Sequence, residues 1–174
     1  MTYSIVFVSK TGNTELVAQA IRSGMPEESC IYFGAPDDRA LDADVIFCGF
    51  WTDKGTCSPD MQDFLTRLDK KHVALFATAG FGCSDEYGKK IFTAVRENLP
   101  QSAEVDGTFL CQGKMPLAVR RRYEAMQQRD PDDARIAMLI ENFDLAQSHP
   151  DDADLHAAEE FAQIACEEYE SQQK

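Results

Sequence analysis

The chain has 174 residues, enough for one well-cored domain and short for two, and its 44% apolar content is ordinary for a globular protein. No apolar run is long enough to cross a membrane and no secretory signal precedes the first strand, so we expect a cytoplasmic protein. The formal net charge is −13, with thirteen acidic residues against two basic ones in residues 130–174, which argues against nucleic acid and membranes as partners and favours a basic partner protein.

The first predicted strand, Ile5–Val8, runs through a short loop into a helix. Its four apolar residues are β-branched or aromatic, as is typical of a buried parallel strand. Such a junction directs unpaired N–H groups and the positive end of the helix dipole at one point, which suits a phosphate. The loop has no acidic residue, and Ser9, Thr11 and Thr14 add three hydroxyl groups. Gly12 permits a close backbone approach there.

Further strands and helices alternate along the rest of the chain. We expect strands at 30–33, 43–50, 72–78 and 104–112, and helices from 59, at 85–99, at 115–128, from about 130 to 146 and at 153–169. This alternation predicts βαβ units, and therefore a parallel sheet with helices on both faces. No cysteine pair or histidine has metal-ligand spacing, so no metal site is predicted, and no side chain is assigned a catalytic role.

The loop after the first strand resembles a known phosphate-binding sequence. Ser9-Lys10-Thr11-Gly12-Asn13-Thr14 is similar to the Ser/Thr-x-Thr-Gly-x-Thr loop of the flavodoxin family, and the flanks agree from residue 5 to residue 21. The resemblance implies one flavodoxin-like α/β domain over residues 1–174, with a doubly wound five-stranded parallel sheet in the order 2-1-3-4-5 and helices on both faces. It also implies that all six loop residues bind the 5′-phosphate of FMN. The simpler alternative is that the hydroxyl groups only cap the helix.

An open parallel sheet binds its ligand beyond the carboxyl ends of its strands, where the strand order reverses. The resemblance implies that two further loops meet the phosphate loop there and hold the flavin ring between Trp51 and Phe81, with Tyr87 as an alternative to Phe81. Trp51 could instead be an ordinary core residue at a strand end, and Phe81 could instead fold over the following helix. Gly55 would permit the backbone flip that flavodoxins make beside flavin N5. The expected ring-loop residues are Phe50, Trp51, Thr52, Asp53, Lys54 and Gly55, and then Ala79, Gly80, Phe81, Gly82 and Cys83.

The resemblance therefore implies an electron carrier that passes electrons from FMN to a larger partner reductase, which docks near the exposed flavin edge. Two alternatives stay open: an FMN-dependent NAD(P)H or quinone-type reductase, and a cofactor-free interaction module. General likeness to a bacterial group of flavodoxin-like proteins, some of which accompany a larger reductase, points to the bilirubin reductase of gut bacteria as a partner. The helical segment at about 114–150 is extra relative to a minimal flavodoxin, and it could be a lid, a docking site or only packing.

Overall fold

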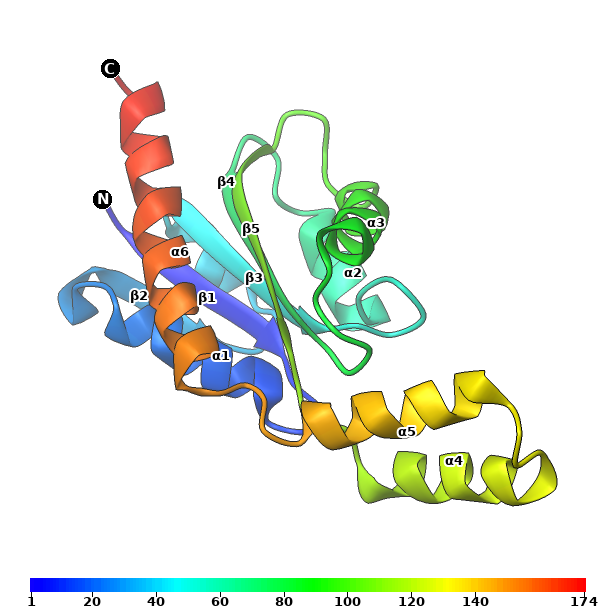
Figure 1. Ribbon diagram of the computed structural model, residues 1–174. Coiled ribbons are helices and arrows are strands. Elements are labelled where there is room, and N and C mark those ends of the chain that lie inside the picture. Colours follow the sequence, from blue (N-terminus) through cyan, green and yellow to red (C-terminus); the bar gives the residue numbers. More distant parts are fainter.

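Five parallel strands form one sheet in the order β2-β1-β3-β4-β5, which confirms the predicted fold class. The computed structural model describes all of residues 1–174 (Figure 1). Because β1 and β3 are adjacent while β2 lies outside β1, the strand order reverses between β1 and β3. The strands are β1 (Tyr3–Val8), β2 (Cys30–Gly34), β3 (Val45–Trp51), β4 (His72–Ala79) and β5 (Glu104–Gln112).

Helices cover both faces of the sheet. On one face lie α1 (Asn13–Ser23) and α6 (Asp152–Gln172), and on the other lie α2 (Pro59–Leu65) and α3 (Asp85–Arg96) (Figure 1). Each layer encloses its own hydrophobic core, so the central strands β3 and β4 are buried from both sides. This explains why their sequences are apolar without alternation. Two short 3₁₀ helices, η1 (Glu27–Ser29) and η2 (Asp38–Asp42), flank β2.

Two helices between β5 and α6 project from the carboxyl-end edge of the sheet. They are α4 (Leu117–Arg129) and α5 (Ala134–Ala146), which form a helical hairpin beside the body of the protein (Figure 1). We call residues 114–150 the arm. None of the helices combines the length and apolar character that a membrane span requires.

Several element boundaries differ from those predicted. Helix α1 begins at Asn13, within the predicted loop, because Gly12 takes the N-cap position with a φ of 87°. Helix α3 ends at Arg96, where the side-chain amide of Asn98 donates to carbonyl groups of the last helical turn. Ser58 takes the N-cap position of α2, but its buried hydroxyl makes no hydrogen bond, so it is not a side-chain cap.

Candidate functional site

A cavity of about 280 Å³ lies at the carboxyl ends of the strands, where the strand order reverses. The loop after β1, the ends of β3 and β4, and the first residues of the arm all contribute to it. Ligands of open parallel sheets bind in such a crevice. A larger cavity of about 400 Å³ lies between α3 and β5, away from the reversal, so the topology favours the smaller one. The smaller cavity is lined by Lys10, Thr11, Asn13, Trp51, Thr52, Thr78, Ala79, Gly80, Phe81, Tyr87, Gly113, Lys114, Met115, Pro116 and Val119.

The loop after β1 leaves its backbone donors open. The N–H groups of residues 11–14 donate no hydrogen bond within the protein, and Leu16 N–H is the first of α1 to bond to a backbone carbonyl, that of Gly12 at 3.0 Å. Gly12 is left-handed, and a Cβ there would meet nothing within 4 Å, so its backbone conformation rather than crowding favours glycine. Open N–H groups at the positive end of a helix form a ready anion site.

Two side chains of this loop point inward and hold it in place. Asn13 donates its amide to the Thr11 hydroxyl at 3.0 Å and to the Lys114 carbonyl at 2.9 Å. The Thr14 hydroxyl lies 3.0 Å from the Thr78 hydroxyl in a buried pair. Of the three hydroxyl groups named from the sequence, that of Thr14 is therefore engaged by β4, and Asn13 positions the loop against the arm.

Aromatic side chains surround the other part of the cavity. Trp51 is the last residue of β3 and is half-buried, and the Lys10 ammonium lies 4.9 Å from the centre of its ring. Phe81 is 56% exposed and is therefore free to cover a ligand. Tyr87 lines the same cavity, and burial raises the pKa of its phenol. The structure thus brings Trp51 together with both of the aromatic residues considered as its counterpart.

Other residues expected in the ring loops lie outside the cavity lining. Phe50 is fully buried and packs edge-on against Phe92 with ring centres 6.2 Å apart, so its side chain belongs to the core. Lys54 and Gly55 form a tight turn with φ values of 49° and 85°, closed by hydrogen bonds between the residues on either side of them. Cys83 lines the larger cavity beside α3. The expected residues that line neither cavity are Ser9, Gly12, Thr14, Phe50, Asp53, Lys54, Gly55 and Gly82.

Sequence reasoning assigned no site residue to the stretch after β5. Gly113, Lys114, Met115 and Pro116 line the cavity, and Val119 joins them from α4. A signal was present, because β5 is parallel to the other strands and its carboxyl end must reach the same edge of the sheet. Gly80 meets this stretch directly: a Cβ there would come within 2.5 Å of the Met115 Cγ.

Charged residues are unevenly distributed around the cavity. Lys10 and Lys114 are the only charged residues that line the cavity. The acidic helix α6 runs away from it toward the amino ends of the strands, where Tyr169 lies 4.7 Å from His72, ring centre to ring centre. Eight of the thirteen acidic residues in 130–174 nevertheless lie on the arm or at the start of α6, at the carboxyl-end edge, and the expected basic docking partner stays a prediction.

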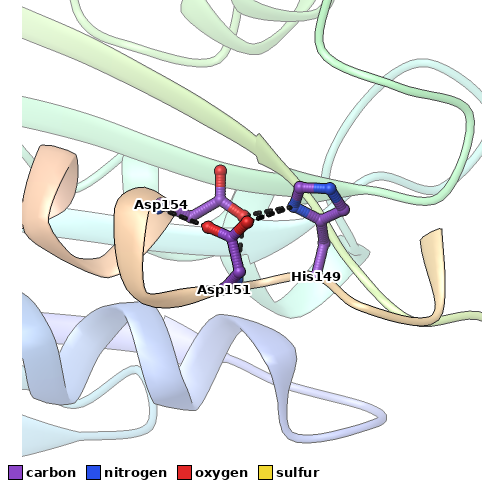
Figure 2. A group of neighbouring side chains, drawn as sticks. All are labelled: His149, Asp151 and Asp154. Carbon is purple, nitrogen blue, oxygen red and sulfur yellow. Dashed lines mark hydrogen bonds and ion pairs between the residues drawn. The ribbon is translucent and has the colours of Figure 1, made fainter. Parts of the chain in front are cut away.

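A cluster of His149, Asp151 and Asp154 marks the start of α6 (Figure 2). The Asp154 carboxylate accepts from the backbone N–H of Asp151 at 3.0 Å and lies 2.6 Å from His149 Nδ1, while Asp154 N–H donates to Asp151 at 2.9 Å. This is a capping box, and it accounts for the position of both carboxylates. The His149 carbonyl also accepts from Lys114 N–H at 3.0 Å, so the cap fixes the arm at its base.

The residues present fit FMN as the resemblance describes it. Open N–H donors beside two lysines suit a phosphate, and no carboxylate lines the cavity. Trp51 with Phe81 or Tyr87 can bury a flat aromatic ring. Cys57 is buried and its thiol pKa is raised to about 11, so it fills space rather than reacting.

Comparison with known proteins agrees with this reading. A family model described as a flavodoxin domain matches residues 4–163. "Flavodoxin-like domain-containing protein BilS" of Clostridium symbiosum (strain WAL-14163) is 34% identical, over 92% of this chain and 94% of that protein. The protein of the same name from Clostridioides difficile (strain CD3) is 32% identical, over 91% and 92%. A flavodoxin from the domain Archaea has a TM-score of 0.59 at 18% identity, over 97% of this chain and 99% of that one, which concerns the fold alone.

Proposed function

The chain belongs to the flavodoxin domain family of FMN-binding electron-transfer proteins, and on that premise we propose that it carries electrons to a larger partner reductase. The observation that carries the proposal is the row of open N–H groups in residues 11–14, at the start of α1 and beside a cavity lined by Trp51 and Phe81. A helix start that leaves its donors free, next to aromatic side chains, supports a phosphate and a ring bound together.

We assign the phosphate to the loop of residues 9–14 and the ring to the cavity beside it. FMN, when bound, supplies the electron exchange. The protein's own residues hold and cover it: the backbone of residues 11–14 donates to the phosphate, and Lys10 adds positive charge. Trp51 and either Phe81 or Tyr87 cover the ring and exclude water. The turn at residues 53–56 lies directly after Thr52, and its Gly55 remains the proposed point of backbone adjustment.

The partner that we propose to test first is the bilirubin reductase of gut bacteria. The two relatives named BilS, each matched over more than nine-tenths of its length, support placing the chain with a specialised bacterial group. An electron carrier needs no side chain that acts on a substrate, and none is assigned here. One observation favours the alternative of a reductase: Met115 and Pro116 of the arm line the cavity, and they could enclose a small molecule beside the ring.

The test is anaerobic, stepwise reduction of the FMN-loaded protein, followed by mixing with purified bilirubin reductase and bilirubin. We expect reoxidation of the carrier's flavin, seen by absorbance, only when both the reductase and bilirubin are present. The apoprotein serves as the control for transfer that does not pass through bound FMN.

Two results would contradict the proposal that the protein is an electron carrier. Rapid oxidation of NAD(P)H by the loaded protein alone, with a quinone as acceptor, would favour the reductase. A purified protein that takes up no FMN on titration would favour the cofactor-free module.

A further inference from the structure

Two side-chain amides meet at one carbonyl of the candidate ring loop. Gln112, the last residue of β5, donates its Nε2 to the Gly80 carbonyl at 3.1 Å, and Asn142 of α5 donates its Nδ2 to the same oxygen at 2.8 Å. The two amides also bond to each other, with 3.1 Å between Gln112 Nε2 and Asn142 Oδ1. We call Gln112 and Asn142 the amide pair. Through it, the arm holds a loop that is 62 residues distant in sequence.

The amide pair fixes the direction of the next backbone N–H. The carbonyl and N–H of one trans peptide point in opposite directions, so a carbonyl held toward the amide pair turns the Phe81 N–H away from it. That N–H donates no hydrogen bond within the protein. Gly80 and Phe81 both line the candidate cavity. In this peptide the Gly80 carbonyl is therefore bonded to the amide pair, while the Phe81 N–H remains open to a ligand.

Packing holds the same peptide from a second side. Met115 lies so close to Gly80 that a Cβ there would come within 2.5 Å of its Cγ, which leaves room for glycine alone. Gln112 is only 9% exposed, so its hydrogen bond to the carbonyl is shielded from water. Loss of Asn142 would leave the Gly80 carbonyl with one donor in place of two, so the direction of the peptide would be held less firmly.

We infer that Asn142 and Gln112 are positioning residues that orient the Gly80–Phe81 peptide so that Phe81 N–H donates to an acceptor atom of the flavin ring. The inference rests on the proposed function, because it takes the ring to lie between Trp51 and Phe81. It gives the arm a role in the site: α5 supplies the amide that sets the backbone of the ring loop.

The test compares FMN with riboflavin, which has the same ring and no phosphate. In wild-type protein, the ratio of the two dissociation constants measures the contribution of the phosphate. Asn142→Leu keeps the size of the side chain and removes its donor. We expect it to weaken the binding of FMN and riboflavin alike, by about fivefold each, so that their ratio stays constant. We also expect the reduction potential of the bound flavin to shift.

Ile136→Ala is the matched control on the same helix. Ile136 is buried in α5 and makes no part of the amide pair, so its truncation loosens the arm without removing a donor from Gly80. We expect a loss of thermal stability with little change in either dissociation constant or in the potential. Asn142→Asp provides a second variant, because it removes the donor with almost no change in volume and stays polar if the leucine variant does not fold.

The outcomes separate the inference from the proposed function. If wild-type protein binds FMN and a folded Asn142 variant retains both affinities and the potential, the positioning role is wrong and the carrier stands. The role is also wrong if Ile136→Ala changes the flavin as much as Asn142→Leu does. A wild-type protein that binds neither flavin would instead remove the proposed function itself.

Discussion

The two edges of the sheet differ in whether certain of their polar groups have hydrogen-bond partners within the protein. At the amino end, the Asp44 carboxylate accepts from the N–H of Thr2 at 2.6 Å and from its hydroxyl at 3.1 Å. Asp106 is likewise hydrogen-bonded to His72, with 3.1 Å between Nδ1 and the nearest carboxylate oxygen. At the carboxyl end, the N–H groups of residues 11–14 have no acceptor in the protein. The carboxylates at the amino-end edge are bonded within the protein, while the carboxyl-end edge keeps a row of backbone donors for a ligand.

The largest predicted effect comes from a carboxylate placed among the open donors. Thr11→Glu would repel the FMN phosphate and compete for the N–H groups of the loop. We expect the dissociation constant for FMN, measured by quenching of flavin fluorescence, to rise about a hundredfold. Gln19→Glu adds the same charge to the exposed face of α1, and it should leave the affinity within about twofold. Equal effects of the two variants would contradict the assignment of the phosphate.

A smaller loss is expected at the aromatic side of the cavity. Trp51→Ala removes a stacking surface, which should weaken FMN binding by about tenfold, and riboflavin binding by the same factor. Trp51→Phe keeps an aromatic ring and should restore most of the affinity. Titration of both flavins measures this. Tight binding by the alanine variant would place the ring elsewhere.

A substitution at the amino-end edge should lower the stability of the protein and leave its affinity for FMN unchanged. Asp44→Ala removes the acceptor of two hydrogen bonds from Thr2, and we expect a loss of about 1 kcal/mol in the free energy of unfolding at pH 7. Hydrogen bonding from the Thr2 backbone holds the pKa of Asp44 below its usual range. Its stabilising contribution is therefore present above about pH 4 and is lost as the pH falls through the folded-state pKa.

Urea unfolding of the apoprotein at pH 7, and again at a pH below the folded-state pKa of Asp44, tests this. The gap between wild type and Asp44→Ala should narrow in acid, while the FMN affinity of the variant at pH 7 stays unchanged. Asp42→Ala, at a neighbouring exposed residue, is the control and should lower stability by less than about 0.5 kcal/mol. A gap that widens in acid would contradict the account of Asp44.

The smallest predicted effect concerns the lysines of the cavity. Lys114→Gln should weaken FMN binding by about threefold at low salt, and the difference should vanish at high salt because the side chain is exposed. Its backbone carbonyl, which binds Asn13, is unaffected by the change. Lys89→Gln on α3 lines the other cavity and should have no effect at either salt concentration. A salt-independent loss for Lys114→Gln would indicate a structural role instead.

The sequence predicted the sheet because its signals are local. Apolar strands and the phosphate-loop resemblance were sufficient for the strand order, and β5 was predicted with its observed bounds at Glu104 and Gln112. Trp51, Phe81 and Tyr87 line one cavity, and their role in holding a ring stays a prediction. Trp51 ends β3 and Phe81 follows the end of β4 by two residues, and the position of strand ends in a parallel sheet is set by topology.

The rest depends on contacts between distant segments. Nothing in the sequence pairs Thr14 with Thr78, or Asn142 with Gly80, because each contact joins residues more than 60 positions apart. Assigning Phe50 to the core and Trp51 to the cavity requires knowing which face of β3 each side chain takes. Composition gives charge without position, so the contact between Tyr169 and His72, which carries the end of α6 to the amino-end edge, could not be predicted.

The most direct measurement is a titration of ¹⁵N-labelled protein with FMN, followed by amide chemical shifts. Amides that are open in the protein should move most when a ligand accepts from them. We predict large shifts for residues 11–14 and for Phe81, and small ones for Thr2 and Asp44 at the other edge. Unmoved signals at residues 11–14, or shifts gathered around Cys83 and Lys89 of the larger cavity, would contradict the account.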